Sequence, residues 1–191
     1  RFLVRIGLKF KIDESEFYQL NKKSTPQDLE PLLAQLKAGN SIGIISDAGC
    51  PGIADPGSLL VEIAHQNHYQ VVPLVGPSSI LLALMASGFN GQSFAFKGYL
   101  HREKPNRAKE ISEMENLSRR TGQTQIFMET PYRNEALWED LMKGLSSNTK
   151  VCIAANINTP TEYIRTKTVE GWKKASKQNL NKIPTIFLLQ A

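Results

Sequence analysis

Cysteine is scarce in this sequence, and no hydrophobic run is long enough to cross a membrane. The 191 residues include two cysteines, Cys50 and Cys152, and no Cys-x-x-Cys pair. This scarcity argues against a disulfide framework and against a zinc knuckle, and it favours a reducing, cytoplasmic setting. The longest nearly apolar stretch, 80–86, is far shorter than the roughly 20 residues of a transmembrane helix. We therefore expect neither a membrane span nor a membrane anchor.

The motifs of the common cofactor and hydrolase sites are missing as well. The chain contains no G-x-G-x-x-G dinucleotide-binding motif, no P-loop and no G-x-S-x-G nucleophile elbow. The three histidines, His65, His68 and His101, lack the spacing of a metal site or of a catalytic triad. We therefore expect no metal ion, and hydrolase chemistry is disfavoured.

The composition is that of a folded chain with a modest basic excess. Hydrophobic residues make up 41% of the sequence and charged residues 21%, which is typical of one or two globular domains. Lys and Arg outnumber Asp and Glu by 23 to 18, and the basic residues cluster in 97–120 and 165–182. Such clusters either bind the phosphates of a polyanion or form an ordinary solvated face, and the sequence leaves both interpretations open.

From residue 25 onward, short apolar runs alternate with helical patterns, which is typical of an α/β fold built largely on parallel strands. A helix is expected after Thr25, because Pro26 and Asp28 form an N-terminal capping pattern. The last two strands are expected to be antiparallel. We predict an N-terminal α/β domain over 1–91 and a C-terminal α/β domain over 92–191. The expected strands are 41–46, 70–75, 93–97, 124–128, 150–155, 162–169 and 184–190, with helices beginning near residues 26, 56, 80, 105 and 132.

Two loops stand directly after expected strands, at 46–56 and 75–79. In open α/β sheets, ligands bind beyond the carboxyl ends of the strands, and small residues let a ligand approach the backbone. The first loop is rich in Gly, Pro and Asp. Asp55 is either the N-cap of a helix that begins at Pro56 or a functional acid, whereas Asp47 caps nothing obvious. Both loops are therefore candidate binding loops.

Residues 46–57, S-D-A-G-C-P-G-I-A-D-P-G, resemble the signature S-D-A-G-T-P-x-I-x-D-P-G of the tetrapyrrole methylase superfamily, in the branch of ribosomal RNA small subunit methyltransferase I. The resemblance continues at 72–79, at 96–100 and at 127–133, where F-M-E-T-P-Y-R is similar to F-[YF]-E-[ST]-P-x-R. It implies a two-domain fold that binds S-adenosyl-L-methionine in the cleft between the domains, and it implies a homodimer.

The resemblance also implies which residues serve the cofactor and the reaction. Glu129 and Asp55 are candidates for assisting methyl transfer, and Arg133 is a candidate for binding a phosphate. The alternative for Glu129 is a structural ion pair with Arg133. The implied cofactor-binding residues are Asp47, Ala48, Cys50, Ser78, Ser79, Met128, Ala154, Ala155, Pro184 and Thr185.

The chain departs from the family pattern in two places. Residues 154–159 read A-A-N-I-N-T where the RNA enzymes have A-R-E-L-T-K, and the family's first strand and its T-P-I-G-N loop are expected before Arg1. We predict a cytoplasmic S-adenosylmethionine-dependent methyltransferase that acts on a ribose 2′-hydroxyl of small-subunit ribosomal RNA. The alternatives are methylation of a tetrapyrrole or another small metabolite, and a catalytically silent S-adenosylmethionine-binding protein.

Overall fold

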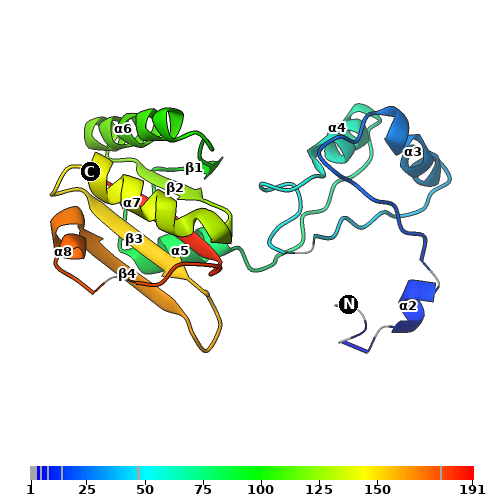
Figure 1. Ribbon diagram of the computed structural model, residues 1–191. Helices are drawn as coiled ribbons and strands as arrows, with labels where there is room; N and C mark the ends of the chain where they lie inside the picture. The colour runs from blue at the N-terminus through cyan, green and yellow to red at the C-terminus, as the bar shows by residue number, and fades with distance from the viewer. Residues whose placement is uncertain (1–3, 5, 8, 14, 47, 177) are drawn as a thin grey trace. The chain divides into compact units, whose positions relative to one another are not determined.

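The computed structural model describes residues 4, 6–7, 9–13, 15–46, 48–176 and 178–191, and the chain divides into two compact units, Arg1–Gly76 and Pro77–Ala191 (Figure 1). Each unit has its own hydrophobic core. Within the described ranges, no helix combines the length and the apolar character needed to cross a membrane.

The first unit is helical. It contains α2 (Lys9–Asp13), the 3-10 turn η1 (Gln27–Leu29), α3 (Glu30–Lys37) and α4 (Ser58–Gln66). The helix predicted after Thr25 is confirmed as η1 followed by α3. The Asp28 carboxylate accepts hydrogen bonds from the Thr25 backbone N–H at 2.8 Å and from its hydroxyl at 2.9 Å. Leu29, Leu32 and Leu60 are buried together and form the small core of this unit.

The strands predicted at 41–46 and 70–75 are wrong. Neither segment has strand structure among its described residues. Ile42 and Ile44 pack against the small core while Ile45 is 74% exposed, so the alternation of an extended segment is present. A strand also requires a neighbour that accepts and donates its backbone hydrogen bonds, and the side-chain pattern on which the prediction rested does not specify one.

The second unit is built on one five-stranded sheet with the order β1-β2-β5-β3-β4. The strands predicted in this half are confirmed as β1 (Phe94–Tyr99), β2 (Thr124–Met128), β3 (Lys150–Ala155), β4 (Tyr163–Thr168) and β5 (Thr185–Gln190). Only β1 and β2 pair in parallel, because β5 lies between β2 and β3 and runs opposite to both. The mixed α/β class is therefore right, whereas the largely parallel sheet is not.

Helices cover both faces of the sheet. One face packs against α5 (Ser79–Ser87), and the other against α6 (Lys104–Thr121), α7 (Asn134–Gly144) and α8 (Val169–Lys173) (Figure 1). Alternate residues of each strand therefore enter different cores, so Ile126 packs with the α5 side and Phe127 with the other. On the α7 side, the rings of Trp138 and Trp172 meet edge to face, with their centroids 5.1 Å apart.

The compact units divide before α5, at residues 76 and 77, because α5 packs on β3, β4 and β5 of the second unit. The predicted boundary between 91 and 92 places this helix in the first domain. The predicted domain boundary of the family fold, between residues 91 and 92, stays a prediction.

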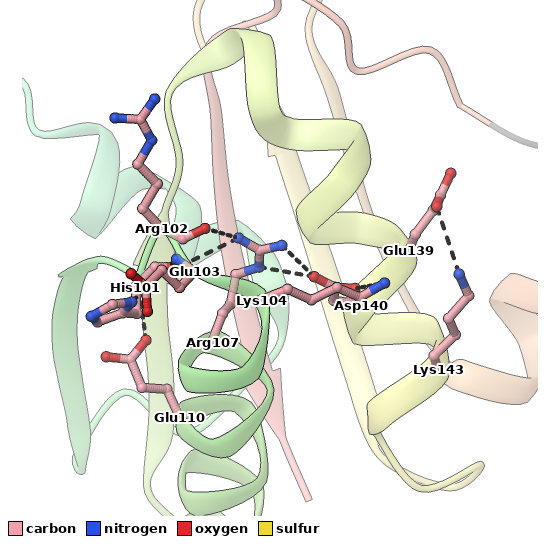
Figure 2. Close-up of polar contacts among 9 residues, drawn as sticks. All are labelled: His101, Arg102, Glu103, Lys104, Arg107, Glu110, Glu139, Asp140 and Lys143. Atoms are coloured by element: carbon pink, nitrogen blue, oxygen red, sulfur yellow. Dashed lines mark hydrogen bonds and ion pairs between the residues drawn. The ribbon is translucent and has the colours of Figure 1, made fainter.

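A buried ion pair joins α6 to α7 (Figure 2). Arg107 donates from Nε and Nη2 to Oδ2 of Asp140, at 2.9 and 2.5 Å, and each side chain is only 8% exposed. The remaining nitrogen, Nη1, donates to the backbone carbonyls of His101 and Arg102. Glu110 accepts from the His101 N–H at 2.7 Å. The connection between β1 and α6 is therefore held by the helix that follows it.

Candidate functional site

One edge of the sheet in the second unit gathers five of the residues implied as cofactor contacts. β1 is parallel to β2, and both β2 and β3 are antiparallel to β5, so the C-terminal ends of β1, β2 and β3 lie at the same edge as the N-terminal ends of β4 and β5. We call this the carboxyl edge. In the sheet register, Ile186 pairs with Met128 and with Ala154, and Thr185 pairs with Ala155. Pro184 directly precedes β5.

Glu129 follows β2 at this edge, and its side chain is only 1% exposed. Oε1 accepts from Arg133 Nη2 and from the Thr130 backbone N–H, each at 2.6 Å, and Arg133 Nε donates to the Thr130 hydroxyl at 3.1 Å. The ion pair that was the alternative interpretation of Glu129 is therefore present. Oε2, however, is buried without a hydrogen-bond partner among the described residues. A buried carboxylate oxygen without a donor is costly, so this atom is left chemically unexplained, as is the buried Oδ1 of Asn134 nearby in the sequence.

The start of β5 is tied to the end of β3. Pro184 accepts from the Asn156 N–H at 3.0 Å, and the Thr185 hydroxyl donates to the Ile183 carbonyl at 2.9 Å. Ala154 and Ala155 are buried on opposite sides of the sheet.

Ser78 and Ser79 lie at the start of α5. Ser78 precedes the helix in an extended conformation, and its side chain makes no capping hydrogen bond. The other end of α5 is fixed by the Thr166 hydroxyl, which donates to the Ser87 carbonyl. Just after α5, the Asn90 carbonyl accepts a hydrogen bond from the hydroxyl of Thr124, the first residue of β2. Because α5 ends near the start of β2, it begins on the side of the carboxyl edge.

The remaining predicted site residues belong to the first unit. Ala48 donates its N–H to the Ser46 hydroxyl at 3.3 Å, and Cys50 accepts from the Ile53 N–H at 3.1 Å, so both lie in a locally hydrogen-bonded turn. Asp55 is half-buried, and Asp47 lies outside the described residues.

The N-cap interpretation of Asp55 is wrong. Helix α4 begins at Ser58, and Gly57 is its N-cap with φ of 139°. This backbone angle is essentially restricted to glycine, so the chain turns at Gly57 and starts the helix two residues after the expected position. Asp55 therefore does not cap α4.

Sequence reasoning missed Asn134, the first residue of α7. Its side chain is fully buried and donates to the carbonyls of Leu180 at 3.3 Å and of Ile183 at 2.7 Å. Lys182 donates its N–H to the Pro131 carbonyl at 3.0 Å. The turn after β2 is thus attached to the segment before β5. An asparagine at a helix start indicates a cap, and nothing local in the sequence pointed to partners 46 or more residues away.

One tyrosine at the edge has a raised pKa. Tyr163 is the first residue of β4 and pairs with Ala155. Burial raises the pKa of the Tyr163 phenol, and the nearby Arg165 opposes that effect.

Residues 16–171 match the family described as Tetrapyrrole (Corrin/Porphyrin) Methylases. The chain is 34% identical over 148 residues to a protein of Vibrio cholerae named Ribosomal RNA small subunit methyltransferase I, covering 78% of this chain and 50% of that one. It is 39% identical over 117 residues to the protein of the same name from Bacillus subtilis, covering 61% of this chain and 38% of that one. The chain spans about half the length of the curated relatives it matches.

Among solved structures, the fold is similar to the crystal structure of the methyltransferase CobJ. The TM-score is 0.57 at 18% sequence identity, and the similarity covers 89% of this chain and 72% of that one. At this identity the likeness concerns the fold alone.

Proposed function

Since the chain belongs to the tetrapyrrole methylase family, we propose that it is part of an S-adenosylmethionine-dependent methyltransferase that acts on small-subunit ribosomal RNA. The observation that carries the proposal is the 34% identity over 148 residues to a protein named Ribosomal RNA small subunit methyltransferase I. The arrangement of the carboxyl edge supports it, because ligands of open α/β sheets bind beyond this edge.

The residues at the edge fit the proposed cofactor. S-adenosylmethionine supplies a methyl group on a positively charged sulfonium and also carries an adenine, a ribose and an amino-acid end. Met128 offers an apolar surface for the adenine, and the hydroxyls of Ser78 and Thr185 offer polar contacts. A buried carboxylate oxygen without a donor, Oε2 of Glu129, suits a site that receives positive charge or a hydroxyl group. In this proposal, Ala48, Cys50, Ser79, Ala154, Ala155 and Pro184 are further cofactor contacts, with Asp47 in the same loop.

Methylation of an oxygen requires an aligned acceptor hydroxyl that loses its proton. We assign the acceptance of this proton to Oε2 of Glu129, because Arg133 and the Thr130 N–H already bind Oε1 and hold the carboxylate in place. Asp55 is the second candidate for this role. Because Arg133 is engaged by Glu129, it contributes to phosphate binding only with its remaining donors. A ribose 2′-hydroxyl is the acceptor in this proposal.

Two further parts of the proposal concern assembly and location. The α5 face that points away from the sheet exposes Leu81 and Met85, the latter at 79%, and a second copy of the chain would cover these side chains. In this proposal the protein is a homodimer, and it lies in the cytoplasm. Light scattering that finds a monomer at micromolar concentration would reject the dimer.

A second candidate is methylation of a tetrapyrrole or another small metabolite. It is favoured by one observation, the sequence A-A-N-I-N-T at 154–159, which lacks the Arg, Glu and Lys of the similar RNA enzymes. A silent binding protein that retains only cofactor affinity would have the same departure.

The test uses the full-length protein, S-adenosylhomocysteine and isolated small ribosomal subunits from a strain that lacks the gene. Heat of binding with S-adenosylhomocysteine and transfer of a labelled methyl group to the ribosomal RNA support the proposal. Labelling of a small molecule in the cell extract, with none in RNA, supports the second candidate. Binding without any transfer supports the silent protein, and absence of binding refutes all three. Glu129→Gln should keep the cofactor affinity and lower the rate of transfer.

A further inference from the structure

Tyr132 exposes its aromatic ring next to the carboxyl edge. It is the most exposed of the five tyrosines, with 75% of its surface accessible, and it lies in the 3-10 turn η2 (Pro131–Arg133), between β2 and α7. A tyrosine on the surface usually lays its ring against neighbouring side chains, since the ring is largely apolar. This one is presented to solvent beside Glu129 and therefore needs an explanation.

The turn that carries the ring is held from several sides. Arg133 binds both Glu129 and Thr130, at 2.6 and 3.1 Å, and the Lys182 N–H binds the Pro131 carbonyl at 3.0 Å. Pro131 itself has a fixed φ. The backbone that carries the ring is therefore already ordered, so a ligand that covers the ring does not have to order the turn.

A cation lies over the ring. The Lys182 ammonium is 5.9 Å from the centroid of Tyr132, and Lys182 is exposed. An aromatic ring next to a lysine is the combination with which proteins bind single-stranded nucleic acid, because each base stacks on the ring while the ammonium faces the phosphate. Stacking of this kind tolerates any base.

We propose that Tyr132 is a stacking platform for an unpaired base of the RNA substrate, with Lys182 contacting the adjacent phosphate. This inference rests on the proposed function, since it assumes an RNA acceptor. The adenine of the cofactor is the other base that would stack on such a ring. A phosphodiester is the better match, because S-adenosylmethionine has no phosphate for the Lys182 ammonium.

The test measures RNA affinity by fluorescence anisotropy with the full-length protein and a labelled single-stranded RNA of about 12 nucleotides, within the usual range of site sizes. Tyr132→Ala should weaken binding by roughly 5- to 100-fold, whereas Tyr132→Phe, which keeps the ring, should stay within about 2-fold of the parent. Lys182→Ala should reduce the slope of log affinity against log salt by about 0.7, the value for one single-strand phosphate contact, and Tyr132→Ala should leave the slope unchanged.

Two controls separate this role from others. Tyr18→Ala removes another exposed tyrosine, in the first unit, and should leave RNA affinity unchanged. S-adenosylhomocysteine affinity should be the same in all variants, and methylation of small subunits by Tyr132→Ala should show a raised KM with an unchanged kcat.

Three results would overturn the inference. If the parent protein binds the RNA and Tyr132→Ala binds it equally well, the stacking role is wrong while the proposed function stands. If Tyr132→Ala loses S-adenosylhomocysteine affinity to the same extent as RNA affinity, the ring belongs to the cofactor site. If the parent protein binds S-adenosylhomocysteine but neither binds nor methylates RNA, the RNA function itself fails, and the stacking role fails with it.

Discussion

Replacing Asp140 by alanine removes the only carboxylate that the described residues place against the Arg107 guanidinium. Both side chains are 8% exposed, so the pair is largely shielded from solvent. Removing one partner of a buried ion pair costs about 3 to 5 kcal/mol, because an uncompensated charge stays behind. Two Arg107 donors lose their acceptor while Nη1 keeps the carbonyls of His101 and Arg102, which favours the lower end of that range. We expect a loss of about 3 kcal/mol.

The assay is urea unfolding followed by tryptophan fluorescence. Trp138 and Trp172 are the two tryptophans of the sequence, and both lie in the second unit, so the signal reports on the part of the chain that contains the ion pair. Lys104 approaches Asp140 at 3.8 Å but is 70% exposed, and Lys104→Ala is therefore the matched control, with an expected change below about 1 kcal/mol.

The double variant Arg107→Met with Asp140→Leu provides the decisive comparison. Replacing a buried pair by apolar residues of similar volume is often neutral, so the double variant should recover most of the stability that Asp140→Ala loses, less the contribution of the two Nη1 hydrogen bonds to the carbonyls of His101 and Arg102. A loss below about 1 kcal/mol for Asp140→Ala, or a double variant less stable than the single one, would refute the reasoning that an unpaired buried charge causes the loss.

Three further predictions concern other buried polar groups and one glycine. Burial opposes ionisation of Glu115, but hydrogen bonds from Thr149 and Ser146 outweigh it and hold the pKa of that carboxyl below its usual 4.5. The stability that Glu115 contributes is therefore present above that pH and is lost as the pH falls through the lowered pKa. Glu115→Gln should flatten this part of a urea-unfolding pH profile. Asn134→Ala should cost about 1 to 3 kcal/mol in the same assay at neutral pH, and unchanged stability would contradict the role of its two hydrogen bonds. Gly57→Ala should lower the thermal midpoint of the first unit in circular dichroism, at a cost of about 1 to 3 kcal/mol, because its φ of 139° suits glycine alone.

Three strands of the second unit, β2, β3 and β5, were predictable because each is a short run of mostly apolar residues that enters the core on both faces. Their order was not predictable. The pattern of β5 is the same whether it lies at the edge of the sheet or between β2 and β3, since periodicity reports which faces are buried and says nothing about the neighbour. For the same reason, the β-branched run at 41–46 predicted a strand wrongly, although Ile42 and Ile44 do pack against the small core.

The family was predictable from the loop at 46–57, and the match over 16–171 confirms it. The gathering of Met128, Ala154 and Thr185 at one edge depends on the sheet register, which no local pattern contains. Asn134 was missed because its partners are distant in sequence.

The position of β5 has a consequence for the order in which the second unit can form. β5 is the last of the five strands in sequence but lies third in the sheet. A nascent chain that has not yet released Thr185 from the ribosome holds only two separate strand pairs, β1 with β2 and β3 with β4. Each pair has an unprotected edge where β5 belongs, and such edges pair readily with other chains. Completion of this sheet therefore waits until β5 has left the ribosome, and a premature stop before residue 185 should yield aggregate rather than a shortened folded domain.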